Sequence, residues 1–261
     1  MRAVAVLAFA TTYGFGFAAC SQAGQLNAAM HAESDMQQSA VTHRAELEVL
    51  IASEDLRTLS RTESLGESEQ REIYFYDTPE LELFNKGVLL RTRKLGDGAA
   101  DSTVLSRSGK AIENSASHMR CAQEGISTTN LCSLRRDIDG EQIDEVAAGR
   151  GEVTQLFSKS QLALARRILP NVYINGLSVF GPIQGRVWKP NVKDIDGTVT
   201  LEEWMLPNGA SVVTLSVRTA AASARDTLVD LRKFLDERGV REIANPGKTE
   251  TALGYFASTL E

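Results

Sequence analysis

The stretch Tyr74–Lys94, YFYDTPELELFNKGVLLRTRK, predicts two strands separated by a turn and a short amphipathic segment. Its three leading aromatic residues are typical of a strand, and the Asp-Thr-Pro that follows ends it. Gly87 separates an apolar stripe from the second predicted strand, residues 88–93, which carries Arg91 and Arg93. Because successive side chains on a strand point to opposite faces, the two arginines share one face.

Two guanidinium groups fixed side by side suit a bound polyanion, because each offers several donors to phosphate or carboxylate oxygens. A solvated edge strand is the alternative interpretation of Arg91 and Arg93, since charged residues usually face water. The turn signal Gly-Asp-Gly at 96–98 favours a hairpin between residues 88–95 and residues 102–107. In that hairpin Arg107 becomes a third candidate on the same wall.

An earlier segment, residues 46–51 (ELEVLI), alternates between acidic and apolar positions and predicts a strand with two different faces. Glu46 and Glu48 share one face with Leu50, and the other face is apolar. If the apolar face packs against helices, both carboxylates face the interior, where they repel each other unless a cation bridges them. The pattern therefore favours a divalent metal, and a solvated acidic edge strand is the alternative.

The second half of the chain repeats strand and turn signals. Residues 177–189 and 198–206 are typical of strands, and Pro-Asn-Gly at 207–209 predicts a hairpin to residues 211–218. Amphipathic helices are expected at residues 155–167 and 221–238, with a short one near the C-terminus. We therefore expect an α+β fold, mainly antiparallel β, in the form of a barrel or strongly curved sheet with flanking helices.

The composition sets limits on function. A chain of 261 residues with 43% hydrophobic and 24% charged residues is typical of a globular protein. A net charge of -6 argues against a broad basic surface for nucleic acid, and it leaves room for an internal basic pocket. After the N-terminus there is no apolar run of about 18 residues, so the body of the chain does not span a membrane. Three scattered histidines and no paired Cys/His motif argue against structural zinc.

The N-terminus predicts export. Residues 1–20 combine a positive start, an apolar stretch and small residues before Cys20, as in a signal peptide, and Phe-Ala-Ala-Cys at 17–20 is similar to a bacterial lipobox. Residues 21–42 are expected to form a flexible tether, and residues 43–261 the folded domain. We expect a periplasmic protein or a lipoprotein anchored to the membrane through Cys20. A cytoplasmic protein with an amphipathic N-terminal helix or a misplaced start is the alternative.

Two further cysteines, Cys121 and Cys132, are compatible with either location. An oxidising compartment permits them to form one disulfide, whereas in the cytoplasm they are more often unrelated thiols.

Taken in order, several short motifs resemble the CYTH domain, or triphosphate tunnel metalloenzyme superfamily, over residues 44–256. The resemblance rests on Glu46-x-Glu48, Tyr76-Asp77-Thr78-Pro79, Gly87-Val88-Leu89-Leu90-Arg91-x-Arg93, Asp101-Ser102-Thr103-Val104, Phe180-Gly181-Pro182-Ile183, Glu202-x-Trp204 with Pro207-Asn208-Gly209, and Lys248-Thr249-Glu250-Thr251-Ala252-Leu253. It implies an eight-stranded antiparallel tunnel whose interior basic residues hold a triphosphate and whose acids hold Mg²⁺ or Mn²⁺.

The resemblance also implies roles for particular residues. The candidate phosphate ligands are Arg91, Arg93, Arg107, Arg186 and Arg218, and the candidate metal ligands are Glu46, Glu48 and Glu202. The expected activity is divalent-metal-dependent hydrolysis of tripolyphosphate or a nucleoside triphosphate. The alternatives are a non-catalytic module that binds a phosphorylated or anionic ligand and, less favoured, a class IV-like adenylyl cyclase. The expected partner is a triphosphate-containing small molecule, not a nucleic-acid duplex.

Three interior positions depart from the superfamily pattern. Leu50 and Leu105 stand where relatives carry lysine, and Thr214 stands where they carry an acid. In a partly desolvated tunnel, each lost charge removes on the order of one to a few kcal/mol of phosphate or metal affinity. These departures favour the binding module, whereas the retained Glu46-x-Glu48 favours the enzyme.

Overall fold

A computed structural model of the chain describes residues 44–63, 65–108, 119–244 and 247–259. The chain divides into two units, Met1–Ala40 and Val41–Glu261. The predicted signal peptide, residues 1–20, and the predicted tether, residues 21–42, lie outside the described residues.

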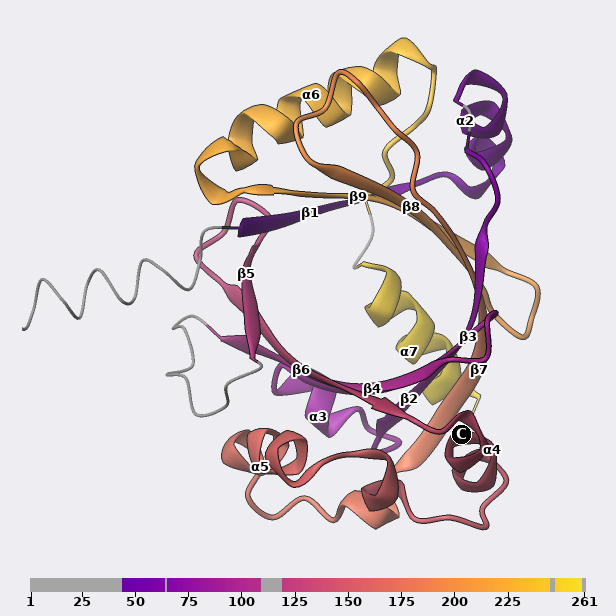
Figure 1. The fold of residues 1–261 in the computed structure, drawn as a ribbon, viewed down its shortest axis with the longest axis vertical. Coiled ribbons are helices and arrows are strands. Elements are labelled where there is room, and N and C mark those ends of the chain that lie inside the picture. Colours follow the sequence, from indigo (N-terminus) through magenta and orange to yellow (C-terminus); the bar gives the residue numbers. More distant parts are fainter. Residues whose placement is uncertain (1–43, 64, 109–118, 245–246, 260–261) are drawn as a thin grey trace, which may run out of the picture. The chain divides into compact units, whose positions relative to one another are not determined.

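In the described part of the second unit, nine strands close into a barrel in the order β1-β5-β6-β4-β3-β2-β7-β8-β9 (Figure 1). Neighbouring strands are antiparallel except β1 and β5, which are parallel. The bounds are β1 Arg44–Ile51, β2 Glu69–Asp77, β3 Val88–Leu95, β4 Ala100–Ser108, β5 Arg120–Glu124, β6 Asn130–Ile138, β7 Ser178–Trp188, β8 Thr198–Met205 and β9 Ser211–Ala220. The predicted α+β, mainly antiparallel barrel is confirmed. The short β5 between β1 and β6 raises the expected eight strands to nine.

The stretch that suggested the fold folds as β2, the four-residue helix α3 (Glu82–Asn85) and β3. Buried Asp77 holds the turn together, because its carboxylate accepts hydrogen bonds from the backbone N–H groups of Thr78, Leu83 and Phe84. Gly87 has a φ of 76°, and a Cβ there would lie 3.1 Å from the carbonyl oxygen of Arg107. Glycine therefore permits both the backbone conformation and the close approach of β4.

Most of the helices cover the outer faces of the barrel, whereas the C-terminal helix packs against its interior (Figure 1). The α-helices not yet given are α2 Leu56–Thr62, α4 Gly140–Ala147, α5 Lys159–Ile168, α6 Ala224–Glu237 and α7 Lys248–Ser258, and the short 3₁₀ helices are η1 Ser53–Asp55, η2 Val153–Leu156, η3 Ile174–Gly176 and η4 Ala221–Ser223. Helix α6 packs on the outer faces of β1, β8 and β9, and α4 and α5 pack on those of β3, β4 and β6. Helix α4 was not predicted, since its short segment buries only Ile143 and Val146.

A third apolar cluster lies inside the barrel. It joins Leu50, Phe75 and Trp204 from the strands to one face of α7, including Leu253 and Phe256. Figure 1 shows α7 within the ring of strands, and the cluster packed on this helix is called the apolar floor below.

The structure contains a disulfide between Cys121 and Cys132, which face each other across β5 and β6. Among the described residues, none of the helices combines the length and the hydropathy that a membrane span needs.

Candidate functional site

The side chains of β3 alternate between the lumen and the outer helices. Leu90 belongs to the outer apolar cluster, and Thr92 is buried on the same outer face, where its hydroxyl lies 2.8 Å from that of Tyr76. Arg91 and Arg93 therefore point into the lumen, with Thr103 and Asp101 opposite them on β4. The structure places these two arginines on the interior wall rather than on a solvated edge.

Of the two arginines on β3, Arg91 has the fewer contacts that offset the cost of burying its positive charge. Its Nε is buried and has no hydrogen-bond partner within the described part of the chain. Burial, with the like charge of Arg93, lowers the pKa of Arg91 to about 10, so the side chain is still protonated at neutral pH. Arg91 is thus a positive charge that has lost much of its hydration and has no ion-pair partner among the residues that the structure describes.

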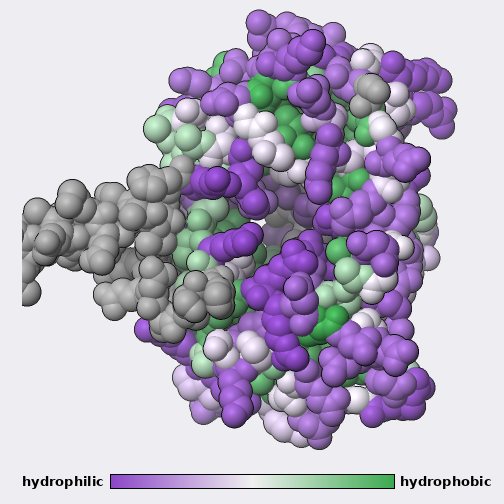
Figure 2. Space-filling view, in the orientation of Figure 1, coloured by the Kyte–Doolittle hydropathy of each residue, from purple (hydrophilic) through white to green (hydrophobic). Residues whose placement is uncertain are grey.

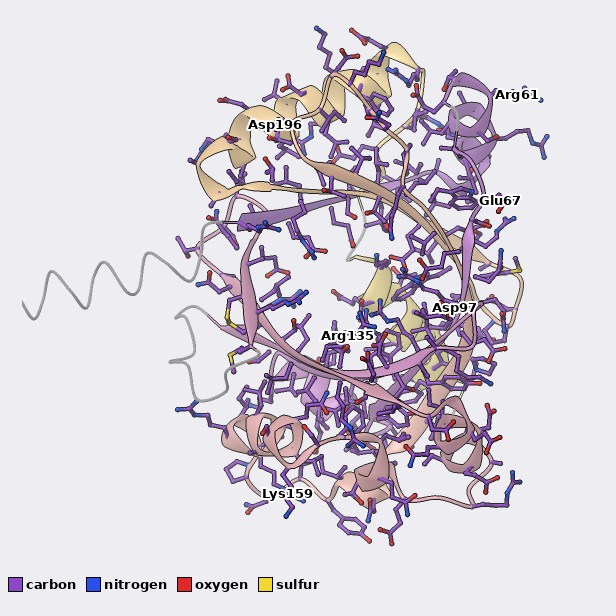
Figure 3. The ribbon with its side chains drawn as sticks, in the orientation of Figure 1. Arg61, Glu67, Asp97, Arg135, Lys159 and Asp196 are labelled. Carbon is purple, nitrogen blue, oxygen red and sulfur yellow. A yellow bond between two sulfur atoms is a disulfide. The ribbon has the colours of Figure 1, made fainter. Side chains whose placement is uncertain are left out.

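Arg93, by contrast, is paired. Its guanidinium donates to both carboxylate oxygens of Asp101, with the closest contact at 2.9 Å, and Asp101 is fully buried. Arg135 from β6 lies 3.5 Å from the same carboxylate and projects from β6 toward the lumen (Figure 3). A buried carboxylate held by two arginines keeps Arg93 in place beside Arg91.

A second cluster centres on Lys248, the first residue of α7. Its ammonium lies 2.5 Å from Glu202 on β8, 3.1 Å from Glu48 on β1 and 3.3 Å from the hydroxyl of Thr214 on β9. The ring of Trp204 is 5.2 Å away, and its indole N–H donates to the other oxygen of Glu202 at 2.8 Å. The structure therefore brings Glu48 and Glu202 together around a lysine.

The charges in this cluster stabilise one another. Burial alone would raise the pKa of Glu202, but Lys248, assisted by Trp204 and Arg91, outweighs it and lowers that pKa to about 2. Burial alone would lower the pKa of Lys248, but Glu48 and Glu202 together raise it above its ordinary value. Both the ammonium and the Glu202 carboxylate are therefore charged at neutral pH.

This coupling predicts an acid-sensitive contribution to stability. Because the pKa of Glu202 lies below its ordinary value of 4.5, its contribution is present above that pH and is lost as the pH falls toward 2. We expect Glu202→Gln to lower the free energy of unfolding by on the order of 2–3 kcal/mol at pH 7, and by less than half as much near pH 3. Urea unfolding of both proteins across this range measures the difference, and a difference that is independent of pH contradicts the prediction.

Two other interior candidates, Arg107 and Arg218, have side chains that are about half exposed and are paired with acids. Arg218 contacts Glu46 at 3.2 Å, and Arg107 contacts Glu124 at 2.6 Å. A pocket of about 240 Å³ lies at β1, β8 and β9. It is lined by Arg44, Glu46, Lys189, Thr198, Thr200, Ser216 and Arg218. The space-filling view shows a hollow in this face of the barrel with hydrophilic residues around it (Figure 2).

Arg186 lies apart from the other candidates. It occupies the outer face of β7, where it pairs with Glu203 and lies over the ring of Trp188. Trp188 belongs to the cluster beneath α6, which places this side of β7 outside the lumen. The structure therefore does not bring Arg186 to Arg91, Arg93, Arg107 and Arg218.

The three departures from the superfamily pattern all face the lumen. Leu50 is buried in the apolar floor, and its cross-strand neighbour Thr214 is fully buried beside Lys248. Leu105 lies opposite Leu89, which packs against the same floor. The structure thus places apolar or neutral side chains at these three interior positions.

The expected divalent metal does not fit the donor set. Among residues 44–63, 65–108, 119–244 and 247–259, no group of three or more His, Cys, Asp or Glu side chains is arranged to hold a metal ion. Glu46 pairs with Arg218, and the space between Glu48 and Glu202 contains the ammonium of Lys248. The three predicted metal ligands therefore divide between two ion-pair clusters.

Sequence reasoning missed three lumen residues. Lys248 was seen only as part of a motif, and Arg71 and Arg135 were not candidates. Arg71 lies 3.9 Å from Glu202 and pairs with Glu69 at 2.8 Å. Arg135 and Arg136 are adjacent on β6, so one of them faces inward, but nothing in the local sequence indicates which.

Solved structures with a similar fold support the tunnel architecture. One is HpAC1 from Hippeastrum, a candidate adenylyl cyclase reported to have a dominant triphosphatase activity. It has a TM-score of 0.59 and 15% identity, and the match covers 81% of this chain and 95% of that one. Another is a candidate adenylate cyclase, bh2851, from Bacillus halodurans, with a TM-score of 0.53, 13% identity, and coverage of 80% of this chain and 98% of that one.

No protein-family model and no curated protein sequence matches the chain. At these identities the similarity is one of fold, and the fold expected from the sequence motifs is confirmed: the chain has a CYTH-like tunnel fold.

Proposed function

We propose that the barrel lumen binds a small molecule that carries a triphosphate group. The observation that carries this proposal is Arg91, a charged side chain in the lumen whose buried Nε lacks a partner. Keeping a cation away from water without a counterion is unfavourable. An anion that contacts Arg91 therefore gains more binding free energy than one that contacts an arginine already paired with an acid.

The surrounding cations favour a chain of phosphates over a single carboxylate. Arg93 and Arg71 lie within electrostatic reach of Arg91, and Arg107 and Arg218 are lumen residues whose side chains are about half exposed. Guanidinium groups bind phosphate oxygens with two parallel hydrogen bonds, and a triphosphate can contact several of them in turn. A compact monoanion can use only the innermost position.

Hydrolysis is the second candidate function, favoured by the triphosphatase activity of HpAC1. Attack of water on the terminal phosphorus needs charge neutralisation, which Arg91 and Arg93 offer, and a group that positions the water. Glu48 and Glu202 are both engaged by Lys248 and are poorly placed for that second role. The geometry therefore supports binding ahead of hydrolysis, and the same reasoning applies to cyclisation of ATP.

Calorimetric titration of the purified protein with tripolyphosphate in EDTA tests the proposal. We expect a Kd on the order of 1–10 µM and binding at least about tenfold tighter than that of sulfate, which cannot span several arginines. Absence of binding by both tripolyphosphate and ATP contradicts the proposal. Assays of phosphate and cyclic AMP release, with and without Mg²⁺ or Mn²⁺, decide whether binding is accompanied by hydrolysis or cyclisation.

A further inference from the structure

The ammonium of Lys248 has a complete set of acceptors. A protonated lysine has three N–H donors, and Glu48, Glu202 and Thr214 offer three oxygens between 2.5 and 3.3 Å from Nζ. The face of Trp204 adds a fourth favourable contact. The lysine side chain is 13% exposed and that of Glu202 is 12% exposed, so these contacts are largely shielded from water.

The cross-strand row of residues next to the ammonium has few negative charges, as expected if one lysine is to neutralise them. Leu50 on β1 pairs with Thr214 on β9, which pairs in turn with Glu202 on β8. Because Leu50 and Thr214 are uncharged, the row contributes a single carboxylate, and Glu48 contributes the second. The two carboxylates are balanced by Lys248 and the nearby Arg91, whose charge also acts on Glu202.

Lys248 is also held in this position by its helix. It begins α7, and three residues of that helix, Ala252, Leu253 and Phe256, are buried in the apolar floor. Moving the ammonium away from the carboxylates requires either an extended rotamer into the floor or a shift of the helix, and both disturb packed side chains. A divalent cation must displace this lysine or add two positive charges beside it and Arg91.

We infer that Lys248 takes the place of a divalent cation between Glu48 and Glu202, so that the lumen binds its polyanionic ligand without a metal ion. The identity of the ligand rests on the proposed function, whereas the role of Lys248 rests on the contacts of the protein alone. The lysine supplies one fixed positive charge at the inner end of the lumen, next to Arg91.

The first test measures Mn²⁺ binding to the ligand-free protein by electron paramagnetic resonance. We expect the wild-type protein to bind Mn²⁺ no more tightly than about 1 mM, the range of weak exposed carboxylate sites. Micromolar binding that is lost in Glu48→Gln and kept in Glu203→Gln overturns the inference. Glu203 is the matched control because it is the next residue on β8 and faces outward to Arg186.

The second test removes the lysine. Lys248→Gln leaves Glu48 and Glu202 without their shared cation, so we expect this variant to be less stable in EDTA and to bind Mn²⁺ about tenfold or more tightly than the wild type. Thermal unfolding should show stabilisation by Mn²⁺ in the variant and not in the wild type. A folded variant that does not respond to Mn²⁺ overturns the inference. If the variant does not fold, the wild-type titration decides.

The third test compares tripolyphosphate binding to the wild type in EDTA and in Mg²⁺. We expect binding in Mg²⁺ to be equal to or weaker than binding in EDTA, because Mg²⁺ competes with the protein for the phosphate oxygens. Binding that is about tenfold or more tighter in Mg²⁺ overturns the inference. Absence of tripolyphosphate binding under both conditions contradicts the proposed function instead, and the Mn²⁺ measurements still decide the role of Lys248.

Discussion

Arg91→Met is expected to weaken tripolyphosphate binding about 100-fold and, at the same time, to stabilise the ligand-free protein. The loss follows from removal of a lumen guanidinium whose buried Nε has no hydrogen-bond partner among the described residues, since truncating a buried charge that contacts a ligand typically costs 2–5 kcal/mol, or roughly 30- to 5,000-fold. Methionine fills a similar volume without a charge that must be kept from water. We therefore expect the free energy of unfolding to rise by about 1–2 kcal/mol.

Calorimetry and urea unfolding measure the two effects separately. Arg186→Met is the matched comparison, because it removes the same charge from the outer face of β7, where Arg186 pairs with Glu203. This variant should bind tripolyphosphate as the wild type does and should gain no stability. If Arg91→Met binds like the wild type, the lumen site is wrong. If it is destabilised, Arg91 has a structural partner in the folded state.

The positions of Arg91 and Arg93 follow from local sequence. An apolar run with arginines at alternate positions, bounded by Gly87 and a Gly-Asp-Gly turn, fixes both the strand and the face they share. The same applies to Glu46 and Glu48, whose apolar neighbours pack under α6 as expected. Period-2 patterns of this kind are reliable because one face of each strand is covered by helices.

Arg186 shows where local pattern fails. Both faces of β7 carry buried apolar residues, with Ile183 in the lumen and Trp188 beneath α6, so the sequence does not indicate which face is interior. The pairing of β7 with β2 also shifts register between Ile73 and Phe75. Because β7 has two apolar faces and an irregular register, the local sequence does not determine whether Arg186 points into or out of the barrel. The packing of the whole barrel determines it.

The lysine cluster could not be derived from spacing at all. Lys248, Glu48 and Glu202 come from three elements that are far apart in the chain, and only closure of the barrel brings them together. Two acids on one strand were therefore expected to hold a metal, since no nearby residue offered a counterion. The counterion of Glu48 and Glu202 is instead Lys248, which belongs to the C-terminal helix α7.

Arg93→Met is expected to destabilise the protein, in contrast to Arg91→Met on the same wall. Asp101 is fully buried, and Arg93 supplies its closest charged contacts, so within the described part of the chain the substitution leaves the carboxylate with Thr103 and the more distant Arg135. Breaking a buried ion pair from one side typically costs 3–5 kcal/mol, and with Arg135 remaining we expect a loss of about 3 kcal/mol in the free energy of unfolding.

The double variant Arg93→Met/Asp101→Asn separates the cost of the unpaired charge from the loss of the arginine itself. If the stranded carboxylate is the cause, neutralising Asp101 should recover most of the lost stability, because the amide can still accept a hydrogen bond from Thr103. Urea unfolding of the single and double variants measures this coupling. A double variant no more stable than Arg93→Met shows that packing of the arginine stem stabilises β3. If Arg91→Met raises the free energy of unfolding and Arg93→Met lowers it, then Arg93 stabilises the fold, whereas Arg91 costs stability and serves ligand binding.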